Sequence, residues 1–267
     1  MRLEPVAAIL LRQWYLLRGS PVRVLPMFAW VGIDIVLWGF ISRFLNAVSA
    51  SGINFTAVFL GAVLLWDLCG RVMQGLTTAF LEDVWSRNFL NLFASPLSIS
   101  EYVTGLVGAS IATSLLGLTV MLTLAVPVFG LSFLALGSHL LLFLLVLYGF
   151  GVALGILASA MVLRFGPASE WLVWPIPALL SPFCAVFYPL TVLPPWMQAV
   201  AHLLPPSYVF EGMRALLQGL PFAPLPALAA LILAALEIAL AGWYFVRVYR
   251  HAVRTGLLAR YSAETVS

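Results

Sequence analysis

Four ionisable side chains lie inside long apolar stretches of this sequence, where a charge is costly in free energy. They are Asp34, Asp67, Arg71 and Glu237. Asp67 and Arg71 are four residues apart, so on one helix face they can form an ion pair. That pair could fix helix packing, or the four groups, with Trp66, could lie along the path of a transported solute. Asp34 and Glu237 have no local partner and could pair with other helices.

The sequence offers no set of residues for catalysis or metal binding. His139, His202 and His251 are scattered without metal-ligand spacing, and no nucleophile, base and orienting group can be assembled. Cys69 and Cys184 lie in apolar stretches, which argues against a disulfide and a zinc site. A phosphate-binding loop, G-x-x-x-x-G-K-[ST], is absent, and the sequence has no lysine to complete one. We expect no catalytic residue, no metal and no cofactor bound by this chain.

Composition indicates an integral membrane protein. Of the 267 residues, 63% are hydrophobic and 9% are charged, whereas soluble domains have about 25% charged residues. Apolar runs of about 18 residues or more indicate transmembrane helices. We predict an all-α membrane fold, a single domain over residues 1–267, with six spans. Pro175, Pro177 and Pro182 interrupt the fifth span and predict that it is kinked or broken. The approximate spans are Val24–Phe44, Phe55–Ala79, Tyr102–Phe129, His139–Leu163, Trp171–Leu193 and Leu225–Val246.

The arginines predict the orientation of these spans. With six spans, both termini lie on one side of the membrane, together with the second and fourth connections. Ten arginines fall on that side, and Arg43 and Arg214 fall on the other. Positively charged loops remain in the cytosol, so both termini are expected there. The excess of positive charge reflects this topology and contact with anionic lipid, and we expect no nucleic-acid partner.

Three segments are too short or too polar to be spans. Residues 1–20 form an amphipathic helix that could lie in the membrane interface and contact a partner, or serve only as an anchor. Its predicted apolar face consists of Leu3, Val6, Ala7, Leu10, Trp14 and Leu17.

The second segment, residues 80–100, carries much of the chain's charge. Ser95-Pro96 ends an amphipathic helix, and Ser98 with Glu101 forms a capping box that begins the next span. The helix is either a solvated interfacial turn or a rigid element that transmits force from a cytosolic partner. Its apolar face would include Val84, Trp85, Phe89, Leu92 and Phe93, and its polar face Glu82, Asp83, Ser86, Arg87 and Asn91.

The third segment, residues 194–222, is expected on the outer side. Proline pairs bracket two helices, about Pro195–Leu204 and Tyr208–Leu217. Ten helical residues reach only about 15 Å, half the hydrocarbon thickness, so these helices must re-enter the outer leaflet or lie across it. They could form a gate or a structural cap. The candidate gate residues are Trp196, Tyr208, Phe210, Glu211 and Arg214.

The order of these segments resembles the membrane subunit of ABC-2 type transporters. The stretch FLEDVWSRNFLNLFASPLS is similar to that family's cytosolic coupling helix between spans two and three. The stretch FYPLTVLPPWMQAVAHLLPPSYVFEGMRALL is similar to its outer region before the last span.

The resemblance implies an exporter of the bacterial cytoplasmic membrane that moves drugs, lipids or lipid-linked polysaccharide. It also implies a second copy of the permease and two cytosolic ATPase subunits, which would hold ATP and Mg²⁺. Residues 1–20 would be a connecting helix that touches the ATPase. The residues expected to couple ATP hydrolysis to transport are Glu82, Asp83, Trp85, Arg87 and Phe89. A proton-coupled carrier that uses the intramembrane acids is the alternative.

Overall fold

The computed structural model describes residues 2–48, 55–86, 92, 95–133 and 136–256, although the side chains of residues 21–28, 30, 31 and 167 are not described. This part of the chain is helical and contains no strand. Short 3₁₀ turns occupy Pro167–Ser169 and Leu190–Val192. The α-helices are α1 (Leu3–Arg18), α2 (Pro21–Val48), α3 (Gly61–Trp85, preceded by a π-helical turn, Thr56–Leu60), α5 (Ile99–Phe129), α6 (His139–Phe165), α7 (Glu170–Val173), α8 (Ile176–Leu180), α9 (Pro195–Ala201), α10 (Pro205–Leu217) and α11 (Pro224–Thr255).

Among the described residues, four helical segments are long and apolar enough to cross a membrane: Thr56–Trp85, α5, α6 and α11. The chain is therefore an integral membrane protein. The 28 residues of α2 extend about 42 Å, which also exceeds the hydrocarbon thickness of about 30 Å. The predicted fifth span is broken, as its prolines led us to expect. Only α7 and α8 are α-helical there, and α8 begins directly after Pro175, because proline cannot donate the hydrogen bond that would continue a helix.

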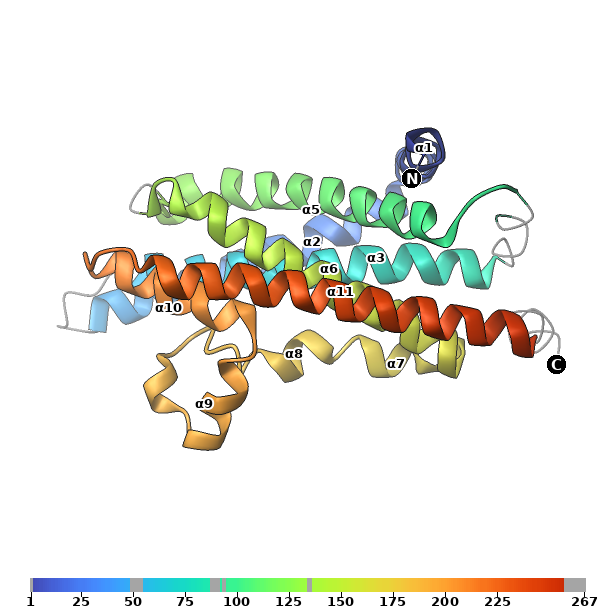
Figure 1. Cartoon of the computed structure of the whole chain (residues 1–267). Coiled ribbons are helices and arrows are strands. Elements are labelled where there is room, and N and C mark those ends of the chain that lie inside the picture. Colours follow the sequence, from blue (N-terminus) through green and yellow to red (C-terminus); the bar gives the residue numbers. More distant parts are fainter. Residues whose placement is uncertain (1, 49–54, 87–91, 93–94, 134–135, 257–267) are drawn as a thin grey trace.

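The long helices run lengthwise through one bundle (Figure 1), and α6 packs against both α3 and α11. Close approach of α6 to α3 depends on Gly151. A Cβ at this position would lie 2.7 Å from the Cys69 carbonyl oxygen and 2.9 Å from Cβ of Val72. The absence of a side chain at this position thus permits the tight contact between the two helices.

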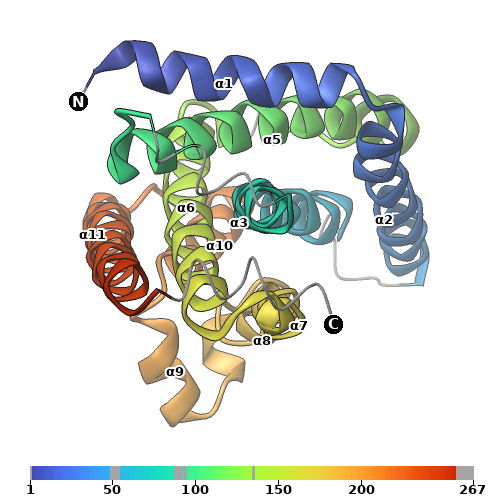
Figure 2. The same cartoon turned by 90° about the vertical axis from the view of Figure 1, so that its right-hand side faces the viewer.

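Both ends of the described chain lie at one end of the bundle. The end of α3, the beginning of α5 and the end of α11 are found there, together with α1, and we call it the basal end. The opposite, apical end holds the last residues of α2 and α5 and the beginning of α6. In Figure 1 α1 is seen end-on while the bundle helices run lengthwise, so α1 lies across the bundle axis, and Figure 2 shows it beside α5. The small α9 projects from the side of the bundle (Figures 1 and 2).

Candidate functional site

Two glycines of α5 form a seat for α1 at the basal end. A Cβ at Gly105 would lie 2.6 Å from Cβ of Ile9, and one at Gly108 would lie 3.0 Å from a methyl carbon of Leu10. Because neither glycine carries a side chain, the α1 backbone can approach α5 closely. The residue buried next along α1 is Gln13.

The inward face of α1 differs from the predicted apolar face. Val6 is buried as expected, but Leu3, Ala7 and Trp14 are exposed and share the outer face with Leu11 and Tyr15. The helix therefore has two apolar sides, one against α5 and one directed outward. The prediction treated all apolar residues as one lipid-facing surface because it could not include the glycine seat.

A buried polar cluster joins α1, α3 and α5 beside this seat. The Arg12 guanidinium donates two hydrogen bonds to Asp83, one of them from Nη1 to Oδ2 over 3.0 Å. The hydroxyl of Tyr102 donates to the same Oδ2 over 2.8 Å. The Asp83 and Tyr102 side chains are fully buried. The hydrogen bond to Asp83 is the main factor that raises the pKa of Arg12. We call Arg12, Asp83 and Tyr102 the basal triad.

A second set of hydrogen bonds attaches α1 to the start of α5. The backbone N–H of Arg2 donates to Glu101 Oε1 over 2.8 Å, and its guanidinium also contacts Glu101 and the Pro96 carbonyl. The predicted capping box is confirmed: Glu101 N–H donates to Ser98 Oγ over 3.3 Å, and Ser98 N–H donates to Glu101 Oε2 over 3.1 Å. The connection between α3 and α5 is thus held to α1 near both of its ends.

The predicted coupling residues do not all lie on the amphipathic helix that the sequence suggested. Glu82, Asp83 and Trp85 belong to the last turn of α3, which continues without a break from the membrane segment. The two faces also point in the opposite directions to those expected of an apolar and a polar side chain. Asp83, from the polar face, points inward to the basal triad, whereas Trp85, from the apolar face, is 49% exposed. Arg87 and Phe89 lie outside the described residues. The sequence did not predict that Arg12 and Tyr102 would bind Asp83. The one available signal was that Arg12 has no acidic residue near it on α1.

The intramembrane charges separate into two locations. Asp67 and Arg71 form the predicted ion pair on α3. Gly117 of α5 leaves room for this pair, since a Cβ there would lie 3.4 Å from Cδ of Arg71. Asp34 of α2 lies within electrostatic range of both charges. These three residues, contributed by α2 and α3, form what we call the mid-bundle cluster.

Glu237 does not join the mid-bundle cluster. It lies on α11, whose neighbouring residues Ala234 and Ile238 pack against Gly149 of α6. The Glu237 carboxylate is close enough to the buried thiols of Cys69 and Cys184 to interact with them electrostatically. One of its carboxylate oxygens is buried and has no hydrogen-bond partner among the described residues. Glu237 thus lies apart from the other three intramembrane charges.

The predicted outer pair, Glu211 and Arg214, fastens α10 to the chain that follows α8. Arg214 Nη2 donates to Glu211 Oε1 over 2.8 Å, and Arg214 Nη1 donates to the Val186 carbonyl over 3.2 Å. The backbone N–H of Leu190 also donates to Glu211 Oε1 over 2.8 Å. The buried Arg214 side chain thus serves as a clamp within the apical region, and its Nε has no partner among the described residues.

Three of the candidate gate residues and one candidate path residue are aromatic, and these four side chains fall into two environments. Phe210 is fully buried on α10, and its ring centroid lies 6.2 Å from that of Trp66 on α3. The gate and path candidates therefore meet at this contact. Tyr208 donates its hydroxyl hydrogen to the His202 carbonyl over 2.8 Å. Trp196 is largely exposed on α9 and touches only Phe183 among the described rings, at 6.1 Å.

Comparison with known families gives a match over most of the chain. The family described as ABC-2 type transporter matches residues 7–217, which include the basal triad, the mid-bundle cluster and the Glu211–Arg214 clamp. No curated protein sequence matches the chain.

Proposed function

The chain belongs to the ABC-2 type transporter family, and from this premise we propose that it is the permease subunit of an ATP-driven exporter. It would move an amphiphilic or lipid-linked solute, such as a drug, a lipid or a glycolipid, by alternating access. Two copies of the chain and two cytosolic ATPase subunits would form the working unit in a bacterial cytoplasmic membrane. ATP and Mg²⁺ would be held by the ATPase subunits, because this sequence has no phosphate-binding loop.

The observation that carries this proposal is the basal triad. It ties α1, α3 and α5 together at the end of the bundle that we assign to the cytosol. A force applied to the connection between Trp85 and Ile99 would therefore move three helices together. Buried charge pairs with added hydrogen bonds strongly resist separation, so the triad is suited to transmit motion from an ATPase into the membrane.

The membrane arrangement follows from the same assignment. We propose six spans, with α2, α3, α5, α6 and α11 as five of them and the broken segment at α7–α8 as the remaining one. Both termini would be cytosolic, as the arginine distribution indicates. The apical helices α9 and α10 would lie in or on the outer leaflet, with the Glu211–Arg214 clamp holding the proposed outer gate in place.

The mid-bundle cluster supports a solute path between α2 and α3. Asp34, Asp67 and Arg71 place both signs of charge at membrane depth, where such groups usually face a cavity or another protein segment. Trp66 precedes Asp67 on α3 and contacts Phe210 of α10, which would connect this path to the outer gate.

The experiment that tests the function is purification from native membranes in mild detergent, with identification of stoichiometric partners. We expect a soluble ATPase to co-purify. Trp85→Arg should reduce its recovery at least several-fold, because Trp85 is an exposed aromatic residue beside the proposed docking segment.

Trp196→Arg is the matched control, since Trp196 is also an exposed tryptophan but lies on α9. This variant should retain the ATPase. Transport by the chain alone, driven by a proton gradient, would instead establish the carrier alternative and direct attention to Asp34, Asp67 and Glu237.

A further inference from the structure

One face of α11 is exposed along the length of the helix and is apolar over most of it. Its large apolar residues follow one another at intervals of three or four, as residues on one helix face do. Each is between 51% and 78% exposed: Leu225, Leu228, Ile232, Leu236, Leu240 and Trp243. From Leu225 to Trp243 the helix rises about 27 Å, which is close to the hydrocarbon thickness of about 30 Å. We call this set the α11 stripe.

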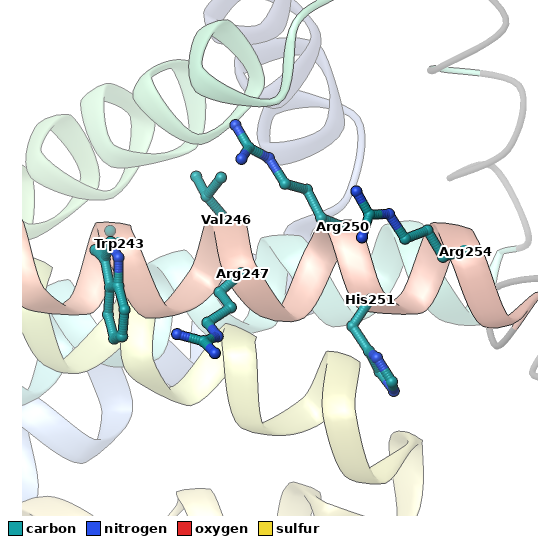
Figure 3. Close-up of a pocket in the computed structure, with 7 residues that line it drawn as sticks. Trp243, Val246, Arg247, Arg250, His251 and Arg254 are labelled. Carbon is teal, nitrogen blue, oxygen red and sulfur yellow. The ribbon is translucent and has the colours of Figure 1, made fainter.

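The same face becomes cationic as soon as the α11 stripe ends. Arg247, Arg250 and Arg254 continue the spacing of three or four residues toward the basal end. Figure 3 shows Arg250 and Arg254 extending to one side of the helix and Arg247 and His251 to the other. An open groove of about 650 Å³ lies here, lined by Trp243, Val246, Arg247, Arg250, His251 and Arg254. We call it the α11 groove.

Among the described residues, no acid neutralises the arginines of the α11 groove. Within the described ranges, Arg247, Arg250 and Arg254 form no ion pair, and no acidic residue lines the groove. The Arg247 guanidinium lies 5.4 Å from the ring centroid of Trp243, a favourable cation–π arrangement. Three exposed arginines therefore line one open groove, directly beyond a membrane-length apolar surface.

We propose that the α11 groove binds the phosphate head group of an anionic phospholipid in the leaflet at the basal end. Guanidinium groups are well matched to phosphate oxygens, which accept paired hydrogen bonds from them. Trp243 belongs both to the stripe and to the groove, and tryptophan is favoured at the boundary between acyl chains and head groups. This continuity favours a lipid over an acidic protein surface. The proposal requires only that α11 spans the membrane and does not depend on the exported solute.

Lipid retention by the purified permease, measured by native mass spectrometry, tests the assignment. The probes are dioleoylphosphatidylglycerol and the neutral dioleoylphosphatidylcholine. We expect a clear preference for phosphatidylglycerol. A basic residue near anionic lipid strengthens attraction by about fivefold, so Arg247→Gln combined with Arg250→Gln should weaken phosphatidylglycerol retention by roughly 30-fold. Retention of phosphatidylcholine should not change.

The matched control is Arg18→Gln combined with Arg164→Gln, which removes the same charge from exposed positions outside the groove but at the same end of the bundle. This control variant should keep most of its preference for phosphatidylglycerol. If it lost as much of that preference as the groove variant, the attraction would be non-specific, and the assignment would be overturned. If the glutamine variant does not fold, Arg247→Lys with Arg250→Lys keeps the charge and should retain phosphatidylglycerol. A folded lysine variant with no preference for phosphatidylglycerol over phosphatidylcholine would overturn the assignment, because two ammonium groups should still attract a phosphate head group.

Two further results would identify a different ligand. Displacement of phosphatidylglycerol by millimolar inorganic phosphate would mean that the groove recognises a free anion. Loss of a co-purifying ATPase from the glutamine variant, with lipid retention unchanged, would make the groove a protein-docking surface. Either result would overturn the lipid assignment, and neither would affect the test of the proposed function with Trp85→Arg.

Discussion

At the scale of single residues, the basal triad concentrates the most consequential polar contacts. Asp83 accepts hydrogen bonds from a cation on one helix and a phenol on another while its own side chain is fully buried. Loss of one partner from such an arrangement costs more than its hydrogen bonds alone contribute, because the remaining polar group stays buried without a partner. Asp83 is therefore the residue whose removal should have the largest effect.

We predict that Asp83→Ala destabilises the folded protein by roughly 3 kcal/mol, the lower end of the range for broken buried pairs, because Arg12 is 28% exposed. Tyr102→Phe should cost about 1 kcal/mol, the value of one hydrogen bond. Thermal unfolding in detergent of these variants, of Arg12→Met and of the double variants would give the coupling energies. Additive effects of Arg12 and Asp83 would contradict the triad.

At the scale of elements, the seat of α1 on α5 is set by glycine. A methyl group at Gly105 would lie 2.6 Å from Ile9 Cβ, and that atom is close to the backbone and cannot rotate away. Close packing transmits such a clash, since interiors have little free volume. The position of α1, and with it the position of Arg12, thus depends on the absence of a side chain at residue 105.

Gly105→Ala should consequently displace α1, with a cost of about 1–3 kcal/mol, and should lower transport more than ATP hydrolysis. Limited proteolysis of α1 and a transport assay would measure both effects. Gly70→Ala on α3 is the matched substitution, because a Cβ there has no atom within 4 Å. It should be neutral or slightly stabilising, as alanine is the better helix former. Equal behaviour of the two variants would argue against the seat.

At the scale of the whole molecule, the two ends of the bundle have different roles in the proposal. Both ends of the described chain and the basal triad lie at one end of the bundle. The Glu211–Arg214 clamp instead ties the chain following α8 to α10, which leads into α11 near the apical end (Figure 1). Trp66 and the mid-bundle cluster lie on helices between them. Opposite ends of one membrane protein can be distinguished by chemical access from each side.

We predict that Leu203→Cys, next to α9, reacts with a membrane-impermeant maleimide on intact cells, and that Thr255→Cys reacts only after permeabilisation. Both positions are exposed. The native Cys69 and Cys184 are buried and should give little background. Reaction of both introduced cysteines from outside would contradict the proposed topology.

Much of this architecture can be predicted from the amino-acid sequence, because the signals act within one helix or one turn. Apolar length indicates the long helices, the prolines indicate the broken segment, and four-residue spacing indicates the Asp67–Arg71 pair. Ser98 and Glu101 define a helix start through hydrogen bonds between neighbouring residues.

The basal triad and the α11 groove depend instead on tertiary structure. Arg12 and Asp83 are 71 positions apart, and no local pattern states that they meet, because their approach depends on two α5 glycines that admit α1. The inward turn of Asp83, the separation of Glu237 from the mid-bundle cluster and the exposed face of α11 likewise depend on which helices pack together. Helical periodicity places residues on a common face, but only packing decides what that face contacts.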